Sequence, residues 1–201
     1  MNSEQAKLKF TVSPDGLYRV FFDLEATCTN KNEFPSTDME VIEIGAVLVN
    51  PKGEVVSKFQ RFIRPEKHPI LTDFCKELTT ITQEDVDGAE IFEDVEMYFN
   101  EWAVINAPDH EKIVFISWGE FDKNILKRQS EELDVDMDYL LNNHQNGKKL
   151  FSLCLGTKRH YGVGTALKHL NMKFEGTPHR AISDAENIKR ILDHVIEYKN
   201  S

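Results

Sequence analysis

The sequence is poor in cysteine, in long apolar runs and in positive charge. Its three cysteines, Cys28, Cys75 and Cys154, are too few and too widely spaced for a disulfide framework or a zinc site, so we interpret them as small buried hydrophobic residues. No stretch approaches the roughly 18 apolar residues of a membrane span, and the polar start MNSEQAKLKF lacks the apolar core of a signal peptide. We therefore predict a soluble, cytoplasmic protein with no membrane partner.

Basic residues are outnumbered, with 24 lysines and arginines against 34 acids and a net charge of −10. This balance disfavours a protein that coats a duplex, because phosphate contacts need many lysines and arginines. The charge is uneven: residues 147–180 hold seven basic residues and one acid, a net +6, which leaves −16 for the rest. This basic strip fits either an ordinary solvated face or a surface that holds phosphates beside an acidic, metal-loaded pocket.

The remaining composition is that of one globular domain. Hydrophobic residues make up 40% and charged residues 29% of 201 residues. We predict a polar tail over residues 1–16 and a single domain over residues 17–201. Apolar runs predict strands at 18–23, 41–49, 54–63 and 113–116 and a short fifth strand at 150–153. The turn sequence at residues 50–53 makes the second and third strands a hairpin.

Helix signals separate and follow these strands. Thr72, and Thr82 with Asp85, are typical N-terminal caps, and apolar residues recur at helical spacing over 91–105 and from Asp122 to about Leu133. Further helices are expected from Gly162 to Leu170 and at the C-terminus. For the last helix we predict a capping box formed by Ser183 and Glu186. The order of elements predicts an α/β domain with a mixed sheet covered by helices.

Two acids interrupt the first predicted strand. Asp23 and Glu25 are two residues apart, so their side chains project from the same face of a strand. Placing two carboxylates side by side in an apolar run costs free energy unless something neutralises them, and oxygen ligands suit Mg²⁺ or Mn²⁺. A solvated strand end is the plainer interpretation of the pair taken alone.

Three further polar residues lie at predicted helix starts. Asp122 follows the fourth strand and opens a helix, where an acid is favourable in any protein. Asp184 falls in the first turn of the last helix, and His179 precedes it in a loop. Alone, His179 is an ordinary surface histidine, although a histidine that titrates near neutrality also suits a general base.

Taken together, these residues resemble the DEDDh exonucleases. Asp23 and Glu25 match the first motif of that family, Asp122 the second, and His179 with Asp184 the third, in the order and with the His-x4-Asp spacing of the DEDDh branch. The residues at 22–28, which flank the first motif, make the DEDDh match specific. Residues 42–46, 74–75, 78–83 and 171–176 look like the Eri-type subgroup of 3′ exonucleases, which trim structured and small RNAs. The family usually has glycine where this chain has Thr80, which puts the details of substrate approach in doubt.

The resemblance implies an RNase H-like fold with a five-stranded mixed sheet flanked by helices. It also implies a 3′→5′ exonuclease domain that releases nucleoside 5′-monophosphates from RNA or single-stranded nucleic acid ends by two-metal hydrolysis. Two divalent cations, Mg²⁺ or Mn²⁺, would be held by Asp23, Glu25, Asp122 and Asp184, with His179 as general base. Two alternatives are a DNA-directed repair or proofreading enzyme and a non-catalytic regulator that binds nucleic acid or protein. The sequence identifies no protein that delivers the substrate.

By the same resemblance, several residues are expected to hold the 3′ end. Ala26 and Thr27 would present their backbone to the terminal sugar, and Leu78 and Thr79 would pack against the terminal bases. Trp118 either stacks on a base or belongs to the core beside the fourth strand. His179 would also contact the substrate. Glu43 is interpreted as a structural residue that supports the site.

Overall fold

The computed structural model describes residues 16–108 and 113–196. All but the last residue of the predicted polar tail, and the end of the predicted domain, lie outside these ranges, so the proposed domain boundaries stay a prediction. Across the described ranges, no helix combines the length and the apolar character that crossing a bilayer requires.

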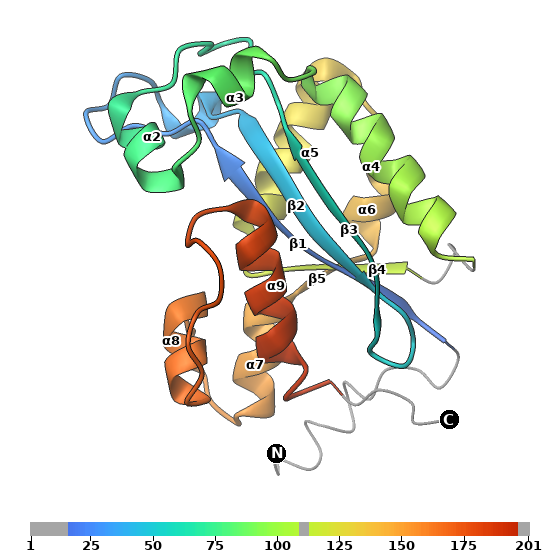
Figure 1. Ribbon diagram of the computed structural model, residues 1–201. Coiled ribbons are helices and arrows are strands. Elements are labelled where there is room, and N and C mark those ends of the chain that lie inside the picture. The colour runs from blue at the N-terminus through green and yellow to red at the C-terminus, as the bar shows by residue number, and fades with distance from the viewer. Residues whose placement is uncertain (1–15, 109–112, 197–201) are drawn as a thin grey trace.

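The centre of the molecule is a five-stranded mixed sheet with the order β3-β2-β1-β4-β5 (Figure 1). Strand β1 (Tyr18–Ala26) pairs antiparallel with β2 (Val41–Val49), which forms the predicted hairpin with β3 (Val55–Phe62). On its other side β1 pairs parallel with β4 (Ile113–Ser117), and β4 pairs parallel with β5 (His144–Asn146). The predicted RNase H-like α/β fold is confirmed.

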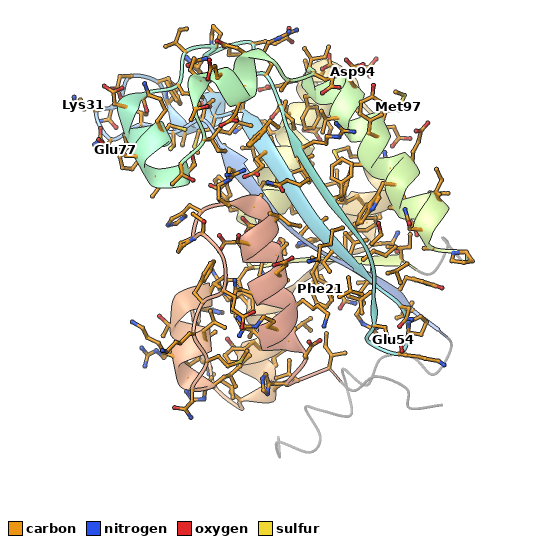
Figure 2. The ribbon with its side chains drawn as sticks, viewed as in Figure 1. Phe21, Lys31, Glu54, Glu77, Asp94 and Met97 are labelled. Carbon is orange, nitrogen blue, oxygen red and sulfur yellow. The ribbon has the colours of Figure 1, made fainter. Side chains whose placement is uncertain are left out.

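Helices cover both faces of the sheet. Helices α4 (Phe92–Asn106), α5 (Phe121–Leu133) and α6 (Asp138–Asn142) pack on one face, against the β1 side chains Val20, Phe22 and Leu24. The other face carries α7 (Gly147–Cys154), α8 (Val163–His169) and α9 (Ala181–Leu192). Phe21 of β1, labelled in Figure 2, is buried on this second face. The alternation of side chains along β1 therefore turns the odd-numbered residues toward α9.

Two short helices close the end of the sheet where β1 finishes (Figure 1). They are α2 (Asp73–Thr79) and α3 (Gln83–Asp87), and a short 3-10 turn, η1 (Ser36–Asp38), precedes β2. The two predicted caps are confirmed: the Thr72 hydroxyl accepts from the Cys75 N–H, and Thr82 forms a capping box with Asp85. Cys75 is a fully buried residue of α2, and Cys28 and Cys154 are partly buried.

Two predictions of local structure are wrong. Residues 150–153 belong to α7, because Asn146 caps a helix there by accepting from the Lys149 N–H at 3.0 Å, and the fifth strand lies earlier, at β5. A short apolar run cannot by itself distinguish a strand from a buried helical turn. Ser183 does not cap α9 either: its Oγ accepts from the Thr177 N–H, and the helix begins earlier, after Arg180.

Candidate active site

Three carboxyl groups meet where β1 and α9 come together. Asp23 and Glu25 project from the α9 face of β1, and Asp184 lies in the first turn of α9. One oxygen from each of Asp23, Glu25 and Asp184 lies within 4.8 Å of the others, with Glu25 buried and the two aspartates half-buried. The β1–β2 register shifts between Glu25 and Ala26, and such irregularities redirect side chains at the end of a strand. The closeness of the Asp23 and Glu25 carboxylates confirms the prediction that both project from one face of the strand.

Asp122 approaches the same group from the start of α5. It is buried, and it accepts hydrogen bonds from the Ser117 hydroxyl and the Leu24 backbone N–H, which tie α5 to the ends of β4 and β1. Its charge acts on Asp23, since Asp122 has the largest effect among the acids that raise the pKa of Asp23. The fourth carboxylate is thus adjacent to the cluster of three without being part of its tightest contact.

The electrostatics of the cluster suit a bound cation. Burial, followed by the charges of Asp122 and Asp184, raises the pKa of Asp23 well above its usual value. Burial and Asp184 raise the pKa of Glu25 to about 8, and burial raises that of Asp122 to about 6. Burial also raises the pKa of Asp184. Acids this close hold protons near neutrality unless a positive charge replaces them, and an all-carboxylate donor set is the one that Mg²⁺ and Mn²⁺ prefer.

A buried ion pair holds α9 against the sheet. The Glu43 side chain on β2 is fully buried, and it accepts from the Arg180 guanidinium at 2.9 and 3.2 Å. Its Oε2 also accepts from the Ala181 N–H at 3.0 Å, so a residue of a neighbouring strand caps the first turn of α9. Gln60 donates to Glu43 Oε1, which also accepts from Arg180. The predicted structural role of Glu43 is explained, and Arg180, which sequence reasoning did not assign, is its partner.

The strand and helix touch at Gly45. A Cβ built on Gly45 would lie 2.1 Å from the Ile182 nitrogen and 2.2 Å from the Ala181 carbonyl carbon. Only a residue without a side chain allows the first turn of α9 to come this close to β2. The sequence Ile-Gly-Ala at 44–46 places a glycine inside a strand, but the reason for it could not be predicted, because the contact partner lies more than 130 residues later in the chain.

His179 lies at the mouth of the site. Its backbone N–H donates to Asp184 Oδ2 at 2.9 Å, and its backbone has a positive φ of 58°. The side chain is exposed, so it is free to meet a substrate and a water molecule. The hydrogen bond fixes the backbone of His179 relative to Asp184. The positive φ of His179 is a backbone conformation that residues other than glycine seldom adopt.

Four of the residues predicted to hold substrate lie at the end of β1 and on α2. Ala26 and Thr27 are buried at the end of β1, where Thr27 exchanges hydrogen bonds with Glu40. On α2, Leu78 is 37% exposed and presents an apolar surface, whereas Thr79 is buried and its hydroxyl donates to the Cys75 carbonyl. Thr79 therefore offers little more than backbone to a ligand.

Two further positions refine the expectations from sequence. Trp118 is buried beside Phe151, and its indole N–H donates to the Tyr161 carbonyl at 2.8 Å, which favours the core interpretation over base stacking. Thr80 has a φ of 61°, so it occupies a left-handed position at the end of α2. A glycine at this place avoids a strain of roughly 1–2 kcal/mol, which explains why the resembling family has one.

The comparisons with known proteins agree with this geometry. A family model described as Exonuclease (RNase_T) matches residues 20–192. The chain is 31% identical over 179 residues to ERI1 exoribonuclease 3 of Homo sapiens and 28% identical over 197 residues to ERI1 exoribonuclease 2 of Xenopus laevis. These matches cover 87% and 89% of this chain, but only 52% and 28% of the relatives. The chain therefore spans about half or less of the length of these curated relatives.

A solved structure is similar over nearly the full length of both chains. The nuclease domain of 3′hExo, a DEDDh family member determined with bound rAMP, matches with a TM-score of 0.83 and 27% identity. The match covers 94% of this chain and 98% of the other. The predicted resemblance to DEDDh exonucleases of the Eri type is confirmed, and the chain belongs to the exonuclease family.

Proposed function

We propose that this protein is a metal-dependent 3′→5′ exonuclease that releases nucleoside 5′-monophosphates from the 3′ ends of RNA or single-stranded nucleic acid. The observation that carries the proposal is the convergence of Asp23, Glu25 and Asp184, with Asp122 beside them, from three elements far apart in sequence. A structural protein gains nothing from holding four mutually repelling carboxyl groups together at the end of its sheet.

The four carboxylates would hold two divalent cations, Mg²⁺ or Mn²⁺. When bound, such ions supply a Lewis acid and a positive charge that stabilises the negative charge developing on phosphate oxygens. The buried surroundings of Asp122 and Glu25 exclude water and strengthen these interactions. The hydrogen bonds from Ser117 and Leu24 would fix the orientation of Asp122 before any ion arrives.

His179 would act as the general base. Its exposed imidazole stands at the mouth of the site, and its backbone is anchored to Asp184. It would accept the proton of the attacking water as the terminal phosphodiester is cleaved, and the last nucleotide would leave with a 5′-phosphate. Ala26, Thr27, Leu78 and Thr79 would position the terminal nucleotides, and Trp118 would support them from the core.

RNA is the favoured substrate. The relatives are exoribonucleases by name, and the similar nuclease domain was determined with a ribonucleotide, rAMP. A DNA-directed enzyme of the same family is the second candidate, because the carboxylate cluster acts on a phosphodiester whatever the sugar. We further propose that the protein acts in the cytoplasm.

The test is hydrolysis of matched 5′-labelled 20-nucleotide RNA and DNA strands with Mg²⁺ or Mn²⁺. We expect a ladder that shortens from the 3′ end, faster on RNA, and its loss in EDTA. Asp23→Asn should abolish the ladder. Asp134→Asn is the matched control, because Asp134 is an exposed acid in a left-handed position that asparagine also tolerates. Faster cleavage of DNA would favour the second candidate, and binding without cleavage of either strand would favour a regulator.

A further inference from the structure

A basic groove lies between α7 and the loop that follows it. The groove has a volume of about 420 Å³, and its lining residues are Lys149, Ser152, Leu153, Thr157, Lys158 and His160. The Ser152 hydroxyl has the Lys148 and Arg159 carbonyl oxygens within 2.9 and 2.8 Å, which ties the loop to the helix. The groove is therefore formed before any ligand binds. We call it the α7 groove.

The first turn of α7 lies against the turn that leads to Asp122. Lys149 Nζ forms an ion pair with Glu120 at 2.9 Å, and Asn146 donates to the same carboxylate oxygen at 2.8 Å. A Cβ built on Gly119 would lie 3.5 Å from Lys148 Nζ, so this ammonium group lies over the turn that leads to Asp122. Its charge lowers the pKa of Asp122, against the dominant effect of burial. One end of the α7 groove is thus only a few residues from a proposed metal ligand.

Among the residues that the structure describes, most cations of this region form no ion pair. Within the part of the chain that the structure describes, Lys148, Lys158 and Arg159 form no ion pair, whereas Lys149 is paired with Glu120. Arg159 lies over the Tyr161 ring at 5.2 Å, and Leu153 on α7 is 45% exposed. In a protein with a net charge of −10, this concentration of unpaired cations is a place where an anion meets no repulsion.

We propose that the α7 groove binds the backbone of the nucleic acid strand several nucleotides upstream of the bond that is cut. This inference rests on the proposed function and extends it from the terminal nucleotides to the strand that follows them. Lys148 contacts the phosphate nearest the acidic site, and Lys158 and Arg159 contact phosphates farther along the strand. The exposed Leu153 side chain provides an apolar surface for a base. The cations suit the phosphates of a nucleic acid, and the exposed Leu153 side chain suits a base. A single strand offers both along its length, so we take a single strand as the occupant of the groove.

The test separates long substrates from short ones. In Lys158→Gln/Arg159→Gln, the KM for a 20-nucleotide RNA should rise roughly tenfold at low salt, while kcat and KM for a dinucleotide stay unchanged. Binding of a 20-nucleotide strand with hydrolysis-resistant phosphorothioate linkages at its 3′ end, followed by fluorescence anisotropy, should weaken to the same degree. Loss of two phosphate contacts should make the salt dependence shallower by about 1.4 in the log–log slope.

The matched control is Lys52→Gln/Lys127→Gln, which removes the same charge from two exposed sites outside the groove. Lys52 lies in the hairpin turn two residues before Glu54, which is labelled in Figure 2, and Lys127 lies on α5 with an acid no closer than 3.8 Å. Equal weakening in both double variants, or an unchanged affinity in the groove variant, would overturn the inference. Since anisotropy needs no cleavage, a wild type that binds through the groove but hydrolyses nothing would contradict the proposed function and leave this inference standing.

Discussion

At the level of single residues, the site is defined by acids whose positions are unfavourable without a counter-charge. The pKa of Glu25 is raised to about 8 and that of Asp122 to about 6, and those of Asp23 and Asp184 are also raised. In each case burial is the largest cause, and the neighbouring carboxylates add to it for Asp23 and Glu25. The folded protein therefore retains protons at this site that the unfolded chain releases near pH 4.

This proton uptake predicts how stability depends on pH and metal. Between about pH 4 and pH 8 the folded state binds more protons than the unfolded state, so the free energy of unfolding of the metal-free protein falls as pH rises through this window. We expect its Tm to be lower at pH 8 than at pH 6, and Mn²⁺ or Mg²⁺ to raise Tm more at pH 8. Differential scanning calorimetry measures both effects.

A variant without one of the charges provides the control for this prediction. Asp23→Asn should raise the metal-free Tm at pH 8 and reduce the stabilisation by metal. A metal-free Tm that rises steadily from pH 6 to pH 8, with Asp23→Asn no more stable than the wild type, would show that the carboxylates do not repel one another as described.

His179 permits a second prediction at this scale. Because its φ is 58°, alanine at this position would combine a chemical change with backbone strain, whereas asparagine tolerates the conformation. His179→Asn should lower kcat by about 10²- to 10⁴-fold with little change in Tm or in stabilisation by metal. Steady-state kinetics on a labelled RNA give kcat, and an unchanged kcat would remove His179 from the proposed chemistry.

At the level of elements, the contact between β2 and α9 positions half of the site. Glu43 caps the first turn of α9 and pairs with Arg180, and Gly45 allows the backbones to approach. Through this contact, Asp184 and the segment around His179 are held opposite β1. A helix whose N-terminal cap comes from another strand depends on the tertiary fold for its starting residue.

Adding one methyl group at this contact should damage both stability and activity. Gly45→Ala places a Cβ 2.1 Å from the Ile182 nitrogen, and the backbone must shift to admit it. We expect a loss of about 3 kcal/mol in the free energy of unfolding, measured by urea denaturation, and a lower kcat. Gly164→Ala on α8 is the control, because a Cβ there meets nothing within 4 Å, and it should stabilise by about 0.5–1 kcal/mol. Equal stability of the two variants would contradict the described contact.

The same elements show what local sequence predicts and what it cannot. Asp23 and Glu25 could be assigned to one face of a strand because the period of a strand is fixed, and the caps at Thr72 and Thr82 act on their own helices. The start of α9 was misplaced because its cap, Glu43, is distant in sequence, and 150–153 was mistaken for a strand because short apolar runs are ambiguous. The convergence of the five site residues was expected only from family resemblance.

At the level of the whole molecule, charge is divided between two neighbouring regions. The acids meet at the end of β1, and lysines line the α7 groove. Under the proposed function, the acids would repel an RNA strand until cations neutralise them, whereas the groove would attract it throughout. In the proposed arrangement, metal loading would control access to the reacting bond more strongly than binding of the strand, and this would let a chain with a net charge of −10 act on nucleic acid.

The central claim is that four clustered carboxylates and a histidine remove single nucleotides from a 3′ end. The most direct measurement uses an RNA labelled at its 3′-terminal nucleotide and identifies the first labelled product formed with Mg²⁺ or Mn²⁺. The account predicts a labelled nucleoside 5′-monophosphate as the first product from the wild type, and none in EDTA or from Asp23→Asn. A labelled oligonucleotide, a nucleoside 3′-monophosphate, or the same product from Asp23→Asn would contradict it.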